Sequence, residues 1–184
     1  MKVLAIIPAR GGSKAIPKKN IKDLNGKPLI HYSIENCRKS KFISRTIIST
    51  DDNNIAKISS KLGAEIIMRP KEISGDEADS ETALLHVLDH LKNKENYEPD
   101  FTVFIQCTSP LIIPQDIDDT IKKLLDNDID IVHTVTPFHG FIWLEDSKNR
   151  MVGVNHDPVK RLRRQDLPLQ YQETGAVYAM KTKG

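Results

Sequence analysis

The chain has 184 residues, a formal net charge of +2, 28% charged side chains and 5% aromatic ones. This length suits one domain with a hydrophobic core, and the near balance of charge with few aromatic rings argues against a nucleic-acid-binding protein. No apolar run approaches the roughly 20 residues that span a bilayer, and no signal peptide precedes the first strand, so we expect a cytoplasmic protein with no membrane partner.

Short apolar runs alternate with amphipathic stretches along the first three quarters of the chain. Strands are predicted at 2–7, 45–50, 64–68, 101–106 and 129–135, and helices at 28–38, 53–62, 80–91 and 114–127. In the first helix, Leu29, Tyr32, Ile34 and Cys37 have the spacing of an inner face. The alternation predicts an α/β fold with a mainly parallel, Rossmann-like sheet and helices on both faces.

The pattern changes after residue 136. Residues 137–170 hold scattered charge and no clean period, residues 143–154 are typical of a hairpin, and 175–180 form a late strand. We therefore expect a single domain, 1–184, with a small inserted lobe.

The two cysteines, Cys37 and Cys107, lie far apart and belong to no CxxC or Cys/His cluster. This spacing predicts neither a zinc site nor a disulfide framework. Because both have apolar neighbours, we expect small buried thiols.

The stretch "IIPARGGSKAIPKKN" (6–20) places cations and glycines directly after the first buried strand. Ligands of parallel α/β sheets bind outside the carboxyl ends of the strands. There, Gly11 and Gly12 would let backbone N–H groups approach an anion, Arg10 would offer a fork to phosphate oxygens, and Lys14 and Lys19 would add charge. The loop thus predicts a polyphosphate site, although it is neither a P-loop nor a GxGxxG motif; the alternative is a solvated cationic turn.

Other predicted strands also end in polar residues. Asp51 and Asp52 follow the second strand, where they would help hold Mg²⁺ or, as we favour, cap the next helix. Arg69 follows the third strand and is either a ligand contact or a surface arginine. Residues 106–110 add a polar cluster after the fourth strand.

Taken together, seven blocks make the chain resemble the acylneuraminate cytidylyltransferases, also called CMP-sialic acid synthetases. They are "ARGGSKAIPKKN", "NGKPLI", "STDD", "RPKEISGDEADS", "QCTSPL", "RRQDLP" and "ETGAVY", and they cover nearly the whole chain in order. The resemblance implies a nucleotide-diphospho-sugar transferase fold and an enzyme that uses CTP and Mg²⁺. Its reaction joins CMP to a nine-carbon 2-keto sugar acid, sialic acid or a bacterial relative, and releases pyrophosphate.

The resemblance also assigns roles to residues. Arg10, Lys14 and Lys19 match catalytic, triphosphate-binding positions; Ser13, Asn20, Arg69, Ala78 and Ser80 match nucleotide-binding positions; and Gln106, Arg164, Gln165 and Tyr178 match sugar-binding positions. A guanidinium such as that of Arg164 suits the carboxylate of the sugar. For Tyr178 packing in the core is the alternative, and Gly175 is better explained by a backbone requirement.

The chain departs from the family pattern in two places. Ala15 stands where the family loop has Gly, and its methyl group would restrict the loop if a positive φ were needed. The "IDxxxD"-like segment, whose aspartates hold Mg²⁺ in the family, does not occur before Gly184. The metal ligands are thus unknown, and we expect a C-terminally truncated chain whose own activity is doubtful.

Members of the family form homodimers through an irregular lobe, which corresponds to residues 138–170 here. The resemblance therefore implies a homodimer with 138–170 as the dimerisation arm, whereas a lobe that covers its own site is the alternative. Two other functions stay open: a nucleotidyltransferase for another sugar and base, or a non-catalytic nucleotide-binding relative.

Overall fold

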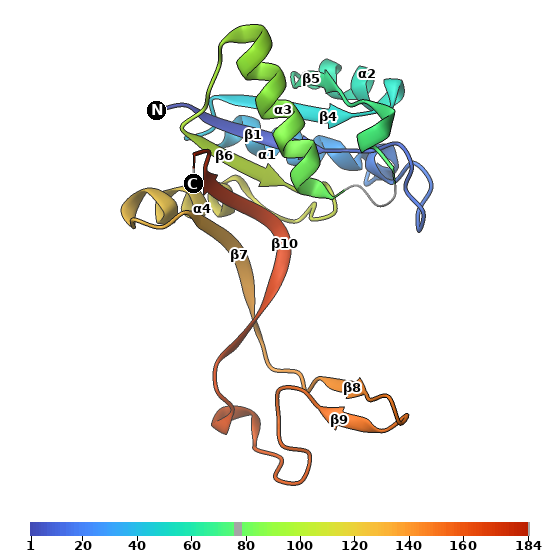
Figure 1. Ribbon diagram of the computed structural model, residues 1–184, viewed down its shortest axis with the longest axis vertical. Helices are drawn as coiled ribbons and strands as arrows, with labels where there is room; N and C mark the ends of the chain where they lie inside the picture. The colour runs from blue at the N-terminus through green and yellow to red at the C-terminus, as the bar shows by residue number, and fades with distance from the viewer. Residues whose placement is uncertain (76–78, 184) are drawn as a thin grey trace. The chain divides into compact units, whose positions relative to one another are not determined.

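A six-stranded sheet in the order β5-β4-β1-β6-β10-β7 organises the chain (Figure 1). The computed structural model describes residues 1–75 and 79–183. The strands are β1 (Val3–Pro8), β4 (Arg45–Thr50), β5 (Glu65–Met68), β6 (Phe101–Ile105), β7 (Ile131–Phe138) and β10 (Gln170–Lys181). Strand β1 pairs in parallel with β4 and β6, β4 pairs in parallel with β5, and β10 runs antiparallel to β6. The predicted mainly parallel sheet is confirmed.

The sheet is covered by the helices α1 (Leu29–Lys39), α2 (Asn53–Lys61), α3 (Ser80–Glu95) and α4 (Pro114–Asp126). The side chains of β1 alternate between two core clusters. Val3, Ala5 and Ile7 pack with the buried residues of α1, α2 and α4, while Leu4 and Ile6 pack with those of α3. Since successive side chains of a strand point to opposite faces, the helices lie on both faces, as predicted.

Local chemistry explains where the helices begin and end. Asp52 caps α2 by accepting the N–H groups of Asn54 and Ile55, so the capping interpretation of Asp52 is confirmed. Gly63, which follows α2, has φ +88°, a conformation that suits glycine. Helix α3 continues to Glu95, four residues beyond the predicted end at Leu91. Its last turn is charged and lies at the surface, and the helix is terminated by Asn96, whose backbone is left-handed.

The predicted inner face of α1 is only partly right. Ile34 and Cys37 are buried, but Ile30 and Ser33 complete that face. Tyr32 is half-buried instead, and its hydroxyl donates to the Leu24 carbonyl, 2.6 Å away. That carbonyl belongs to a small hairpin of β2 (Asp23–Leu24) and β3 (Lys27–Pro28), which precedes the helix.

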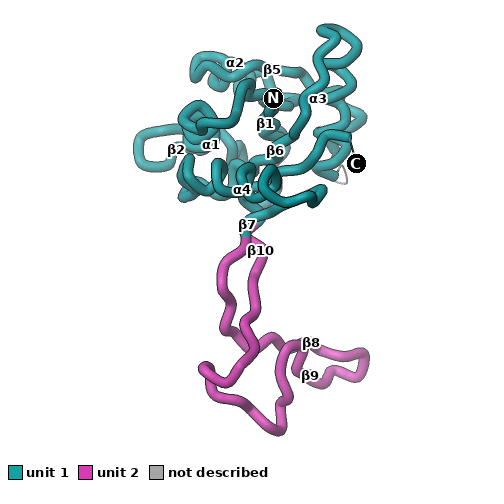
Figure 2. Tube along the Cα trace, turned by 90° about the vertical axis from the view of Figure 1, so that its left-hand side faces the viewer, with its two compact units in different colours: residues 1–134, 175–184 teal, residues 135–174 magenta. Residues whose placement is uncertain are grey.

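Two compact units can be distinguished: unit 1 consists of residues 1–134 and 175–184, and unit 2 of residues 135–174 (Figure 2). In unit 2, β8 (Trp143–Glu145) pairs antiparallel with β9 (Met151–Gly153), which confirms the predicted hairpin. The described residues also form three 3₁₀ turns, at Lys19–Ile21, Lys71–Ile73 and Arg164–Asp166. None of the helices formed by the described residues is long and apolar enough to cross a membrane.

Candidate functional site

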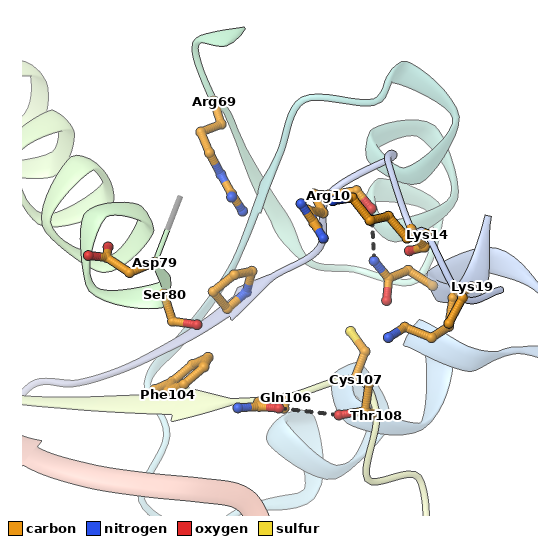
Figure 3. Close-up of a pocket in the computed structure, with 14 residues that line it drawn as sticks. Arg10, Lys14, Lys19, Arg69, Asp79, Ser80, Phe104, Gln106, Cys107 and Thr108 are labelled. Atoms are coloured by element: carbon orange, nitrogen blue, oxygen red, sulfur yellow. Dashed lines mark hydrogen bonds between the residues drawn. The ribbon is translucent and has the colours of Figure 1, made fainter. Parts of the chain in front are cut away.

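A pocket of about 440 Å³ opens in unit 1 where β1, β5 and β6 end (Figure 3). Eight of the predicted site residues line it: Arg10, Ser13, Lys14, Lys19, Asn20, Arg69, Ser80 and Gln106. The sequence predicted that strand ends distant in the chain would meet at one edge of the sheet, and in the structure they do.

The backbone around Arg10 is held on three sides. The Ala9 N–H donates to the Ser49 carbonyl (2.9 Å), the Gly11 N–H donates to Oδ1 of Asp51 (2.9 Å), and the carbonyl of Arg10 accepts from Nδ2 of Asn20 (3.0 Å). The Arg10 guanidinium lines the pocket and donates to the Gly75 carbonyl at 3.1 Å. A loop held in this way presents its cation at a defined place.

Two expectations about this loop change. The N–H of Gly11 was predicted to approach an anion, but the Asp51 carboxylate already accepts it. A Cβ at Gly11 would lie 2.9 Å from the side chain of Asp52, so close packing is the reason for glycine there. Ala15 is not among the described residues with positive φ, so its methyl group does not meet the backbone restriction that was expected there.

Arg69 is a buried cation in the wall of the pocket, only 7% exposed. Its Nε donates to Oγ of Ser49 (3.1 Å) and its Nη2 to the Ser49 carbonyl (2.8 Å). Burial lowers the pKa of Arg69, and the positive charge of Arg10 lowers it further, while the Asp51 carboxylate acts in the opposite direction. Two guanidinium groups that repel each other beside one pocket favour an anionic ligand.

Gln106, at the end of β6, is oriented by its neighbours. Its Oε1 accepts from the Thr108 hydroxyl at 3.2 Å, which leaves its NH₂ group as a donor for a ligand. Gly175 has φ +67°, which confirms the backbone requirement, and a Cβ there would lie 3.9 Å from both the Gln106 amide and the Tyr178 hydroxyl. Tyr178 stacks on Phe104 of the pocket wall, with ring centroids 5.4 Å apart.

Both thiols are buried, as expected, and Cys107 forms part of the pocket wall. Burial raises the pKa of each thiol to about 12. The charge of Lys19, which also lines the pocket, opposes this rise at Cys107.

A family model described as cytidylyltransferase matches residues 4–183. The chain belongs to the cytidylyltransferase family. A pseudaminic acid cytidylyltransferase from Campylobacter jejuni is 35% identical over 97% of this chain and 78% of its own length. N-acylneuraminate cytidylyltransferase A of Danio rerio is 34% identical over 97% of this chain but 41% of its own.

Solved structures give the same fold. The structure of CMP:2-keto-3-deoxy-manno-octonic acid synthetase complexed with CTP has a TM-score of 0.74 and 19% identity, covering 99% of this chain and 75% of that one. A 4-diphosphocytidyl-2C-methyl-D-erythritol synthase from Anaerococcus prevotii has a TM-score of 0.65 and 15% identity, covering 99% and 72%. At this identity the likeness concerns the fold alone.

Within this cytidylyltransferase fold, the remaining predicted residues lie in different places. Ser80 begins α3 and faces the pocket beside Asp79, whose carboxylate caps the helix through the Thr82 N–H at 2.7 Å. Ala78 lies outside the described residues. Arg164 and Gln165 are exposed in a 3₁₀ turn of unit 2.

Pro8, Asp79 and Phe104 also line the pocket and were not predicted as site residues, whereas Cys107 and Thr108 lie in the predicted polar cluster 106–110 without an assigned role. Phe104 lies in an apolar strand, a pattern that predicts a core residue. Thr108 carried a detectable signal, since it belongs to the polar run that follows β6.

Among residues 1–75 and 79–183, no group of three or more His, Cys, Asp or Glu side chains is placed to hold a metal ion. Asp51 and Asp52 lie together after β4, and each also accepts a backbone N–H through its Oδ1. Within the described ranges there is therefore no preformed group of three or more such ligands for Mg²⁺, and two neighbouring carboxylates alone do not make a dedicated site.

Proposed function

We propose that this chain transfers CMP from CTP to a nine-carbon 2-keto sugar acid. The anomeric 2-hydroxyl oxygen of the acid attacks the α-phosphorus, its bond to phosphorus forms as the bond to the β-phosphate oxygen breaks, the hydroxyl proton is released, and pyrophosphate leaves. The observation that best supports this is a pocket at the strand ends, in a member of the cytidylyltransferase family, lined by four basic side chains: Arg10, Lys14, Lys19 and Arg69.

The basic side chains suit the triphosphate. A leaving pyrophosphate gains negative charge, so fixed cations stabilise the transition state more than the ground state. Arg10, Lys14 and Lys19 would neutralise that charge, and Ser13 would donate from the same loop. Because the backbone of Arg10 is held at both flanking amides, little reorganisation is needed as the charge develops.

Other residues that line the pocket suit the nucleoside and the acid. We assign Arg69, Ser80 and Asn20 to cytidine, and Asn20 also donates to the Arg10 carbonyl of the loop. The NH₂ group of Gln106, whose Oε1 accepts from the Thr108 hydroxyl, would donate to the sugar acid. We assign Arg164 to the sugar carboxylate and Gln165 and Tyr178 to the sugar side, while Ala78 stays a predicted contact to the cytosine edge.

Mg²⁺ completes the proposal as the cofactor. Proteins often bind this ion through one or two carboxylates plus substrate phosphates and water. With no ready cluster among the described residues, we assign the ion mainly to the CTP phosphates, where it would supply further charge neutralisation.

The enzyme is proposed to act as a cytoplasmic homodimer with 138–170 as the dimerisation arm. No residue of 135–174, all of which are described, is buried. Apolar side chains such as Trp143, Leu144 and Leu169 are therefore exposed to solvent in a single chain. Exposed large apolar side chains in this number are typical of a segment that contacts another protein.

The proposal is tested by pyrophosphate release from CTP and Mg²⁺ with pseudaminic acid, N-acetylneuraminic acid or the eight-carbon 2-keto-3-deoxy-octonic acid. We expect release with one of the nine-carbon acids, and calorimetric binding of CTP in preference to UTP, ATP and GTP. Release only with the eight-carbon acid, or equal binding of UTP, would contradict the assignment.

A further inference from the structure

An acidic residue lies where the proposed triphosphate site needs positive charge. Asp51 follows β4, and its Oδ1 accepts the Gly11 N–H at 2.9 Å. Gly11 belongs to the loop that gives Arg10, Ser13 and Lys14 to the pocket. A carboxylate repels polyphosphate, so its presence beside this loop calls for a compensating role.

The turn that carries Asp51 is fixed independently of the pocket. The next residue, Asp52, caps α2 through the N–H groups of Asn54 and Ile55, and its own N–H donates to the Thr50 hydroxyl at 3.1 Å. Thr50 is fully buried. The Asp51 carboxylate is thus attached to a rigid strand-to-helix junction.

The same junction supports the phosphate loop sterically. A Cβ at Gly11 would meet the Asp52 side chain at 2.9 Å, so the Gly11 backbone packs directly on it. Gly11, the residue after Arg10, therefore both packs against the Asp52 side chain and donates a hydrogen bond to Asp51. The amide on the other side, that of Ala9, is held by the Ser49 carbonyl.

Asp51 also acts on the charge of the pocket. Its carboxylate raises the pKa of Arg69, in opposition to burial and to the charge of Arg10. It therefore offsets part of the repulsion between the two guanidinium groups before an anion binds.

We propose that Asp51 is a positioning residue for the nucleotidyl transfer, acting through the Gly11 N–H to hold Arg10 at the triphosphate. This inference rests on the proposed function. It assigns Asp51 no contact with substrate, and it explains why a carboxylate lies beside a cationic loop.

The test compares D51A and D51N with the parent chain in steady-state kinetics for CTP. Alanine removes the acceptor, so kcat/KM should fall about 10-fold, mainly in kcat. Asparagine keeps an acceptor oxygen for the Gly11 N–H and should stay within about 3-fold of the parent. D23A is the matched control, because Asp23 also accepts a glycine N–H, that of Gly26 at 3.1 Å, in a hairpin outside the pocket; it should leave kcat unchanged.

A double-mutant cycle with R10A separates positioning from an independent role. If Asp51 acts through Arg10, D51A should cost little in the R10A background. Additive losses would overturn the proposal, as would an unaltered D51A. A D51N variant that is as impaired as D51A and needs more Mg²⁺ would instead make Asp51 a metal ligand.

Amide hydrogen exchange of Gly11 gives a readout that does not depend on turnover or on full stability of the variants. Exchange should accelerate in D51A and stay slow in D51N; equal exchange in D51A and the parent would overturn the contact. If the parent chain is inactive but shows this exchange pattern, the proposed function is wrong, whereas the hydrogen bond from Gly11 to Asp51 is supported.

Discussion

Unit 1 buries many of its apolar side chains in a core, whereas unit 2 leaves its apolar side chains exposed or only partly buried. In unit 1, residues 3–7 of β1 are completely buried, and helices enclose them on both faces of the sheet. In unit 2, Trp143 is 45% exposed, Leu144 60% and Val159 93%. Since burial of apolar surface is the main stabilising contribution to folding, unit 1 has its own source of stability, whereas unit 2 gains little from itself.

Unit 2 does have local order of another kind. The His156 ring lies 4.6 Å from the ring centroid of Phe141 and 4.7 Å from that of Trp143, and the Arg161 guanidinium lies 4.4 Å from the Phe141 centroid. Such contacts fix side chains without removing them from water. The pocket thus lies in the unit that has a core of its own, whereas unit 2 leaves its apolar side chains exposed in a single chain.

The sharpest test of this contrast is one truncation in each unit. Ile117→Ala removes a fully buried side chain of α4 and should lower the free energy of unfolding by about 2–5 kcal/mol. Leu144→Ala should change it by less than about 0.5 kcal/mol in the monomer. Urea denaturation at low protein concentration measures both, and equal losses would mean that unit 2 has a core of its own.

The second prediction concerns the chemistry of unit 1. Arg10→Ala should lower kcat about 100-fold, because it removes a held cation from the site of developing charge. The matched control is Lys61→Ala, an exposed cation at the end of α2, which should have no effect. Initial rates over a range of CTP concentrations decide the matter: a change confined to KM would exclude a role of Arg10 in the transition state.

A third prediction separates the effects of one side chain on the two proposed substrates. Arg164→Ala should raise KM for the sugar acid about 10-fold and leave KM for CTP unchanged, since a charge-assisted contact to the carboxylate is lost. Arg163→Ala is the control, because the Nε of this neighbouring residue is paired with Asp166 at 2.7 Å on the exposed turn. Equal effects of Arg164→Ala on both substrates would remove Arg164 from the carboxylate role.

The sequence predicted the fold of unit 1 well because its signals were local. Gly63 marked the end of α2, Asp52 its cap, and the apolar run of β1 a strand buried on both faces. The pocket was predictable for a related reason: parallel strands bring their carboxyl ends to one edge, so Arg10, Arg69 and Gln106 had to converge.

What the sequence did not reveal depends on long-range packing. Nothing local says that the Gly11 N–H meets Asp51, 40 residues away, and the motif itself indicated an anion instead. Phe104 reads as a core residue, yet it lines the pocket as well. In unit 2, short strands and exposed apolar residues give no period from which burial could be inferred.

The last prediction concerns how the free energy of unfolding depends on pH, and it compares His86 with His139. Its expected effect is the smallest. The imidazole of His86 on α3 has a buried Nδ1 that accepts or donates no hydrogen bond among the described residues. Burial lowers the pKa of His86 below 6.5, the charges of His90 and Arg69 lower it further, and only Asp89 opposes them. As the pH falls through 6.5, the unfolded chain therefore takes up a proton before the folded one does, and stability decreases.

His86→Gln should reduce this loss of stability between pH 7.5 and 5.5 by less than about 1 kcal/mol, because the ring is still partly solvated. His139→Gln, at an exposed position of unit 2, serves as the control. Urea midpoints across that range measure the effect, and a steeper loss in His86→Gln would mean that the folded state stabilises the imidazolium form.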